Sequence, residues 1–248
     1  MNEFSFSVPQ NITVGKGSLA KLPEVAKKSG GSHAFLMSGP HLAKMGLVEK
    51  AAESLKVAGI AVDTFTDIEG NPSVETVDKA TAAFKESGAD FIVAFGGGSP
   101  MDVAKAVGVT AKYGGSITEY EGAHKVPGPI IPLIAIPTTA GTGSEVTAFS
   151  VITNYQTGVK YPLADFNITP DVAIVDPDLV IGLPVKQVAY TGMDALTHAI
   201  EAYVSTLNCP FTDPLALQAI EMVLDYLPAS YKCDMVAREQ MHYAQCLA

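Results

Sequence analysis

The chain has 248 residues, of which 48% are hydrophobic and 17% charged, and 16 basic against 26 acidic side chains give a formal net charge of −10. A chain of this length can form one large domain or two modest ones with a substantial buried core. An acidic surface repels the phosphate backbone of nucleic acids. The composition therefore argues against nucleic acid as a partner.

The sequence also predicts a cytoplasmic protein that does not associate with membranes. Its first residues lack the basic segment and long apolar run of a signal peptide. The most apolar stretch, residues 130–136, is short and contains Pro132, so we expect no membrane span. Cys209, Cys233 and Cys246 are odd in number and have no CxxC spacing, which favours a reducing compartment.

Short apolar runs alternate with helical patterns through most of the chain. We expect strands at residues 32–38, 60–67, 90–95, 130–136 and 171–175, and helices at residues 18–29, 41–57, 73–87 and 100–112. Strands separated by helices in this way are typical of a parallel sheet that is covered on both faces. The sequence therefore predicts an α/β fold for this part.

The pattern changes near Pro184, after which helical stretches follow one another. We expect helices at residues 185–206 and 212–227, the second ended by Pro228, and a third from residue 234 onward. We place a domain boundary here, with an α/β domain at residues 1–183 and a helical domain at residues 184–248. The last helical pattern has no glycine, asparagine or proline at its end. A chain that ends in a helix and a chain cut within one are equally compatible with that pattern.

The first segment with a chemical signal is FGGGSPMD at residues 95–102, between an expected strand and an expected helix. Glycines let the backbone approach a ligand closely, and the N-terminus of the helix offers free N–H groups and positive partial charge. Ser99 is the expected N-cap, and a diphosphate is the expected ligand. Met101 stands where the Rossmann pattern G-x-G-x-x-G has its third small residue, so a tight turn without a ligand is the alternative.

The second segment is PTTAGTGSE at residues 137–145, which also follows an expected strand. Its hydroxyl side chains and glycines can surround a phosphate or a ribose. In an open α/β sheet, ligands bind at the carboxyl ends of the strands, where this loop and the glycine-rich loop would both lie. Two such loops at one edge favour a nucleotide site over a purely structural loop.

The third segment contains Asp194 and His198, which are four residues apart in an expected helix. At this spacing both side chains reach one point on the helix face, and a carboxylate with an imidazole suits a divalent transition metal. A local hydrogen bond between the two is the alternative. Functional metal sites usually take three or four protein ligands. His33 and His41 are distant in sequence and His242 lies on the last expected helix, so we expect Asp194 and His198 to leave the rest of the coordination shell to water, with a third nitrogen from His242 as the less favoured alternative.

These three segments occur together and in this order in a known family. The chain resembles the iron-containing (group III) alcohol dehydrogenases, near the lactaldehyde reductase, 1,3-propanediol dehydrogenase and butanol dehydrogenase branches. The matching stretches are GGGSPMDVAK at residues 96–105, PTTAGTGSEVT at 137–147 and GMDALTHAIEAY at 192–203, with Asn71-Pro72 and Asp176-Pro177. The resemblance implies a Rossmann-like parallel-sheet domain followed by an all-helical domain, as in the dehydroquinate synthase-like architecture, with cofactor and metal in the cleft between them.

The resemblance also implies which residues bind the cofactor and the metal. Gly97, Gly98 and Ser99 match the loop that holds the diphosphate, and Asp194 and His198 match the first two metal ligands. The other positions at which family members contact the cofactor are Gly39, Asn71, Asp102, Thr138, Thr139, Thr142, Ser144, Thr147, Phe149, Lys160 and Leu179. The resemblance assigns no catalytic acid or base here.

The implied reaction is hydride transfer between NAD or NADP and a small primary alcohol or diol, or its aldehyde. Fe²⁺ is the implied metal, although aspartate and histidine accept Zn²⁺ at least as well by intrinsic affinity. Two alternatives remain, a fragment that binds nucleotide without turnover and a zinc glycerol-dehydrogenase-like polyol oxidoreductase. The TTAGTGSE and DALTHAIEAY segments argue against the second.

Two features depart from the family pattern. Family members take two further histidine ligands from beyond the point where this sequence ends, so the resemblance implies a chain cut within the helical domain, and a homo-oligomer for the complete protein. NAD-preferring members carry aspartate at the position of Gly39. Because Gly39 neither binds the adenosine ribose nor repels a 2′-phosphate, we expect NADP to be used at least as well as NAD. The alternative is a simple turn glycine, with Asp67 binding the ribose.

Overall fold

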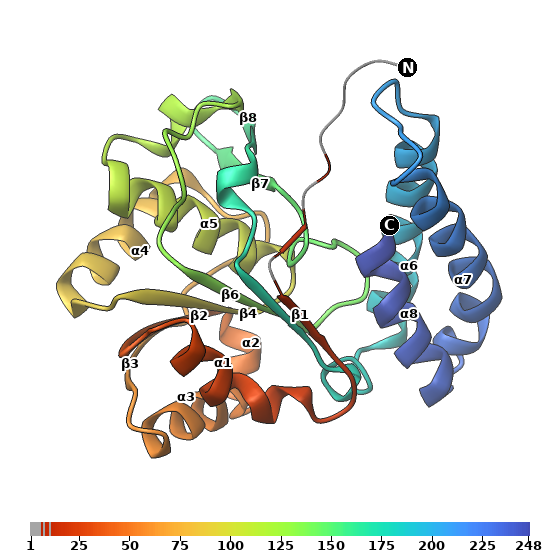
Figure 1. Cartoon of the computed structure of the whole chain (residues 1–248), viewed down its shortest axis with the longest axis horizontal. Coiled ribbons are helices and arrows are strands. Elements are labelled where there is room, and N and C mark those ends of the chain that lie inside the picture. Colours follow the sequence, from red (N-terminus) through yellow and green to blue (C-terminus); the bar gives the residue numbers. More distant parts are fainter. Residues whose placement is uncertain (1–5, 7, 10) are drawn as a thin grey trace.

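The computed structural model describes residues 6, 8, 9 and 11–248. A sheet with helices on both faces lies to the left in Figure 1, and three long helices from the C-terminal part of the chain lie to its right. The predicted order, an α/β part followed by helices, is confirmed. None of the helices among these residues is long and apolar enough to cross a membrane.

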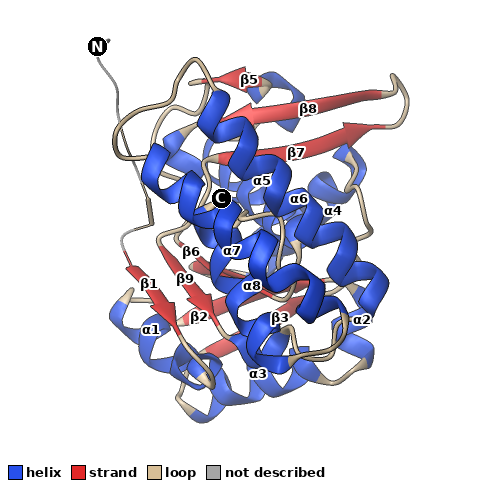
Figure 2. Cartoon of the chain, turned by 90° about the vertical axis from the view of Figure 1, so that its right-hand side faces the viewer, coloured by secondary structure: helices blue, strands red, loops and turns tan. Residues whose placement is uncertain are grey.

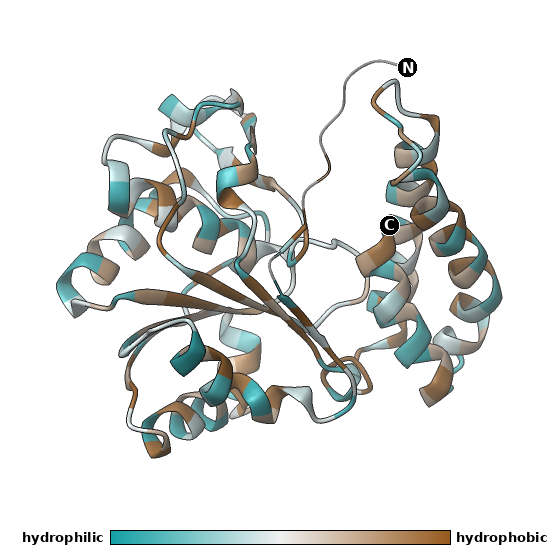
Figure 3. Cartoon of the chain, viewed as in Figure 1, coloured by the Kyte–Doolittle hydropathy of each residue, from teal (hydrophilic) through white to brown (hydrophobic). Residues whose placement is uncertain are grey.

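The main sheet contains six parallel strands in the order β1-β9-β6-β4-β2-β3. The strands are β1 (Asn11–Val14), β2 (His33–Ser38), β3 (Ala61–Phe65), β4 (Phe91–Gly96), β6 (Leu133–Pro137) and β9 (Val172–Val175). The inner strands are hydrophobic along their length (Figure 3). This is typical of a parallel sheet that helices cover on both faces.

Two helices cover each face of this sheet. α1 (Leu22–Lys28) and α3 (Leu47–Val57) pack on one face, and α4 (Val74–Ser87) and α5 (Gly98–Tyr113) pack on the other. Neighbouring residues of one strand belong to different cores, as the alternation of side chains in a strand requires.

The prediction of one continuous helix over residues 41–57 is wrong. Residues 41–57 form two helices, α2 (Pro40–Lys44) and α3, because Gly46 between them has a φ of 72°. This left-handed conformation ends a helix, and glycine adopts it without steric cost. The break separates the short α2, which borders the site described below, from the helix that packs on the sheet.

A second, smaller sheet was not expected from the sequence. It consists of β5 (Gly122–Ala123), β8 (Val159–Ala164) and β7 (Phe149–Asn154), and β7 and β8 are antiparallel. Its strands are partly exposed and contain no continuous apolar run, so they lack the signal of a buried strand. The sheet contacts α5 through β7.

The C-terminal part consists of α6 (Val185–Val204), α7 (Asp213–Tyr231) and α8 (Met235–Leu247), which pack beside one another (Figure 2). A small apolar core that includes Val223 and Met241 joins them. The prediction that Pro228 ends the second helix is wrong, since α7 continues through it to Tyr231. A proline this close to the helix end deprives one carbonyl, that of the exposed Leu224, of its hydrogen-bond partner.

Candidate functional site

A cavity of about 1190 Å³ opens at the carboxyl ends of β2, β4 and β6 and extends to α6. The loops that follow these three strands form its floor, as expected for a ligand site in an open parallel sheet. Every residue that the family resemblance placed at the cofactor or the metal lines it: Gly39, Asn71, Gly97, Gly98, Ser99, Asp102, Thr138, Thr139, Thr142, Ser144, Thr147, Phe149, Lys160, Leu179, Asp194 and His198.

The glycine-rich loop leads directly into the N-terminus of α5. Gly97 is the N-cap and the helix begins at Gly98, so the expectation that Ser99 caps this helix is wrong. No side chain caps the helix, which leaves its first N–H groups without a side-chain partner beside the cavity. Free N–H groups at a helix N-terminus bind anions, and this arrangement fits a diphosphate.

The hydroxyl-rich loop packs directly against the glycine-rich loop. A Cβ atom on Gly97 would lie 3.2 Å from Thr139 Cγ2, and a Cβ atom on Gly98 would lie 3.0 Å from Thr142 Cγ2. The Oγ1 atom of Thr139 is buried and has no hydrogen-bond partner among the described residues. Because buried hydroxyl groups are normally hydrogen-bonded, this unpaired atom beside the glycines also fits a polar ligand.

Asp102 lines the cavity, but the protein itself occupies both of its oxygens. Oδ1 accepts a hydrogen bond from Ser144 Oγ at 3.0 Å, and Oδ2 accepts one from the backbone N–H of Val151 at 3.3 Å. Burial raises the pKa of Asp102, while Lys105 opposes this. These contacts indicate that Asp102 orients Ser144 and β7.

Lys105 is a site residue that the sequence analysis missed. Its fully buried Nζ donates to the backbone oxygens of Phe149 at 2.7 Å and Thr147 at 2.9 Å, and to Ser144 Oγ at 3.1 Å. Burial lowers the pKa of Lys105 to about 8, although Asp102 and then Glu145 oppose the shift. Lys105 therefore holds the segment 144–149, which lines one side of the cavity.

Asp194 and His198 project from α6 toward the same cavity. Their Oδ1 and Nε2 atoms are 3.8 Å apart, too far for a hydrogen bond, and their side chains are 46% and 42% exposed. The local hydrogen bond, which was the alternative from the sequence, is therefore not formed. The carboxylate and the imidazole fit two of the ligands of a divalent cation.

No third metal ligand joins this pair among the residues that the structure describes, where no three histidine, cysteine or acidic side chains are grouped closely enough to hold an ion. The less favoured alternative, in which His242 supplies a third nitrogen, is not realised. His242 is fully buried on α8, and neither of its ring nitrogens has a hydrogen-bond partner in the described part of the chain.

The far end of the cavity is bordered by Gly39, the N-cap of α2. A Cβ atom there would meet one backbone oxygen, that of Ile68, at 3.3 Å, so the position is close to the next strand end but not enclosed. Asp67 does not line the cavity; Glu69 does, but its carboxylate accepts hydrogen bonds from Ser73 and Thr76. No acidic group is therefore free at this corner among the described residues that line it.

The sequence analysis also missed the apolar side of this end. Leu42, Met45 and Leu47 from α2 and the start of α3 line it together with Ile68. Leu42 and Leu47 also pack against the core on one face of the sheet, and Ile68 belongs to the other core. Gly46 is the sequence signal that could have separated α2 from α3.

The chain matches known proteins along nearly its whole described length. A model of the iron-containing alcohol dehydrogenase family matches residues 9–177, and a model of the C-terminal part of the Fe-containing alcohol dehydrogenase family matches residues 188–248. The chain is 50% identical over 246 residues to the NADPH-dependent butanol dehydrogenase of Clostridium saccharobutylicum, which covers 98% of this chain and 63% of that protein.

Solved structures agree with this match. A crystal structure of a 1,3-propanediol oxidoreductase has a TM-score of 0.96 and 39% identity, covering 99% of this chain and 65% of that one. A sulfoacetaldehyde reductase from Bifidobacterium kashiwanohense in complex with NAD+ has a TM-score of 0.93 and 36% identity, covering 100% of this chain and 66% of that one. The chain thus spans about two thirds of the length of these relatives. Because the two family models together account for nearly all of it, the chain belongs to the iron-containing alcohol dehydrogenase family.

Proposed function

We propose that this protein is a metal-dependent alcohol dehydrogenase that interconverts small primary alcohols or diols with their aldehydes, using NAD or NADP. The observation that carries the proposal is that three segments far apart in the sequence line one cavity. These segments are the glycine-rich loop, the hydroxyl-rich loop and the carboxylate–imidazole pair of α6. The names of the relatives, a butanol dehydrogenase and a 1,3-propanediol oxidoreductase, support this substrate class.

The dinucleotide would bind across the carboxyl edge of the sheet and would supply the hydride acceptor or donor. The free N-terminus of α5 at Gly98 and Ser99 would hold its diphosphate. Thr138, Thr139 and Thr142 would orient the nicotinamide half, and the apolar surface beside Gly39 would take the adenosine half. The protein's main contribution is then the geometry of the reacting groups.

Asp194 and His198 would hold a divalent cation, Fe²⁺ in this family, which would act as a Lewis acid on the substrate oxygen. Both side chains line the same cavity as the glycine-rich and hydroxyl-rich loops. A cation that they hold would therefore lie in the same cavity as the cofactor.

We also propose a division into a dinucleotide-binding domain at residues 1–183 and a metal-side helical domain at residues 184–248. The last strand of the main sheet, β9, ends at Val175, and α6 begins at Val185, which supports this division.

For cofactor choice, we propose that NADP is used at least as well as NAD. The absence of a free carboxylate among the described lining residues beside Gly39 supports this, as does the NADPH dependence of the butanol dehydrogenase.

The test is anaerobic oxidation of butan-1-ol and of propane-1,3-diol with NADP⁺ and added Fe²⁺, followed through the absorbance of NADPH. We expect alcohol-dependent reduction of NADP⁺ that His198→Ala abolishes and that a control outside the cavity, His33→Gln, retains. Binding of NADP⁺ without any alcohol-dependent turnover would overturn the proposal and favour a chain that only binds nucleotide. Activity that survives His198→Ala would overturn the assignment of the metal pair.

A further inference from the structure

Helix α8 carries buried polar side chains that the proposed function does not use. Arg238 and Gln245 are seven residues apart, about two helical turns, and are 3% and 1% exposed. A buried polar side chain costs free energy unless it is hydrogen-bonded. The partners of these two residues therefore indicate what α8 is built to hold.

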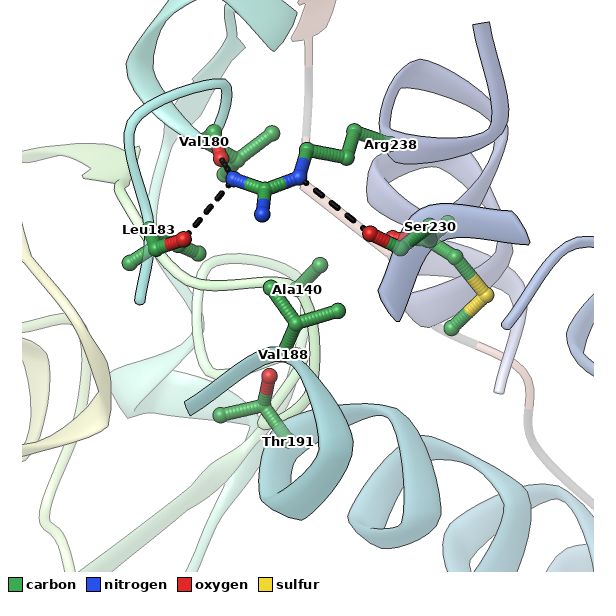
Figure 4. Close-up of a pocket in the computed structure, with 8 residues that line it drawn as sticks. Ala140, Val180, Leu183, Val188, Thr191, Ser230 and Arg238 are labelled. Atoms are coloured by element: carbon green, nitrogen blue, oxygen red, sulfur yellow. Dashed lines mark hydrogen bonds between the residues drawn. The ribbon is translucent and has the colours of Figure 1, made fainter. Parts of the chain in front are cut away.

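Arg238 binds the segment that connects the sheet to α6 (Figure 4). Its Nη1 atom donates to the backbone oxygens of Val180 at 3.2 Å and Leu183 at 2.8 Å, and also to that of Ile181. Its Nε donates to the oxygen of Ser230, at the C-terminal end of α7, at 3.4 Å. Within the described residues Arg238 forms no ion pair, so its charge is solvated by backbone carbonyls and by Cys233 Sγ, to which Nη2 donates at 3.5 Å.

The segment that Arg238 binds is also one wall of the site. Leu179, Gly182 and Leu183 line the large cavity, and the preceding turn, Pro177–Leu179, follows the end of β9. The guanidinium therefore fixes the back of a loop whose front faces the cavity. Because three backbone carbonyl groups of this loop accept hydrogen bonds from Arg238 Nη1, Arg238 constrains the backbone conformation of the loop.

Gln245 binds the opposite wall. Its Oε1 accepts a hydrogen bond from the backbone N–H of Gly143 at 2.8 Å, and its Nε2 donates to the buried carboxylate of Glu145. Gly143 has a φ of 58°, and a Cβ atom on it would lie 3.1 Å from the backbone oxygen of Gln245. The neighbours of Gly143 on either side, Thr142 and Ser144, line the cavity.

We propose that Arg238 and Gln245 are positioning residues, which hold the 179–183 and 141–145 walls of the cleft at the separation that a bound dinucleotide requires. One rigid helix spans both loops, so α8 couples the sheet to the helical part that carries Asp194 and His198. The inference rests on the proposed function for the identity of the ligand. Neither side chain lines the large cavity at the strand ends. Their effect on ligand binding is therefore transmitted through the two loops.

The test compares NADPH affinity, measured by fluorescence titration, in the native chain and in Arg238→Met and Gln245→Met. Gln245→Met removes the hydrogen bonds at nearly constant side-chain length, and Arg238→Met removes the guanidinium while keeping an apolar stem. The matched control is Glu239→Gln on the same helix, which weakens the partly exposed pair with Lys16 at 2.7 Å and touches neither loop. We expect the dissociation constant to rise roughly tenfold or more in the two test variants, as when partners that orient binding groups are removed, and to stay within about twofold in the control.

A second readout separates positioning from general loss of stability. In native-state hydrogen exchange, Gln245→Met should raise exchange in residues 140–146 and Arg238→Met should raise exchange in residues 178–186, each without the other. Uniform acceleration over the whole chain, or unchanged exchange in both loops, would overturn the inference. So would native NADPH affinity in both variants.

The two proposals fail in different ways. If the native chain does not bind NADPH, the proposed function is overturned, and the exchange pattern still decides whether α8 positions the two loops. If the native chain binds NADPH and both variants bind it equally well, the positioning role is overturned and the proposed function stands.

Discussion

Replacing His242 with leucine is expected to make the fold less sensitive to acid. His242 is fully buried on α8, and neither ring nitrogen has a hydrogen-bond partner in the described part of the chain. Burial lowers the pKa of His242 from 6.5 to about 4. The folded protein therefore holds a neutral imidazole at a pH where the unfolded chain has already bound a proton.

The sign and the size of the effect follow from proton linkage. Between pH 6.5 and about 4 the unfolded state binds more protons at His242 than the folded state, so the free energy of unfolding falls as the pH falls through this window. Going from pH 7.5 to pH 5.5, the two pKa values give a loss on the order of 1 kcal/mol from this one side chain. The loss approaches about 3 kcal/mol below the folded pKa.

The assay is urea unfolding at pH 7.5 and pH 5.5 for the native chain, His242→Leu and an exposed control, His41→Gln. We expect the loss of stability between the two pH values to be on the order of 1 kcal/mol smaller in His242→Leu than in the native chain, with no such change in the control. At pH 7.5 the leucine variant should be at least as stable, because it removes a buried donor that has no acceptor. An equal pH effect in the native chain and in His242→Leu would refute the reasoning.

Three further predictions concern the site and the surface. Gly39→Asp should shift the preference toward NAD by about tenfold, on the order of 1.4 kcal/mol, because a carboxylate binds the ribose and repels the 2′-phosphate; equal affinity ratios for NADH and NADPH in both proteins would contradict this. Fe²⁺ or Zn²⁺ should bind weakly to Asp194 and His198, which leave the remaining ligand positions to water; calorimetry that gives a sub-micromolar affinity abolished by His198→Ala would contradict it. The chain should self-associate through apolar side chains such as Val204, Leu207 and Leu224, which are 71%, 85% and 60% exposed; a stable monomer in light scattering would contradict it.

The main sheet could be predicted because its inner strands are continuous apolar runs. β2, β4 and β6 are buried on both faces and read as such from the sequence. The edge strand β1 and the small sheet could not be predicted, because their residues are partly exposed and show no such run. The edge strand β3 is also partly exposed, but its β-branched and aromatic residues Val62, Thr64 and Phe65 are typical of a strand, so its position could still be predicted.

The residues that face the ligand could be predicted from the sequence more completely than the residues that hold the loops in place. Glycines, threonines and the Asp194–His198 pair have local spacings with a chemical meaning, and the parallel fold brings them to one edge. Lys105, Arg238 and Gln245 act through tertiary hydrogen bonds to backbone atoms that are distant in sequence. No local pattern encodes such partners, so these residues appear only in the folded structure.

We expect the cleft to bind a dinucleotide through the loop at Gly97 and Gly98. An NADPH titration of Gly98→Val measures whether this loop is needed for binding. A Cβ atom on Gly98 would lie 3.0 Å from Thr142 Cγ2, so the valine side chain would fill the space between the two loops. Ala61→Val is the control, because Ala61 is exposed on β3 and does not line the cavity. The account predicts saturable binding of one NADPH per chain in the native protein and the control, and affinity at least about tenfold weaker in Gly98→Val. Equal NADPH affinity in all three proteins would contradict it.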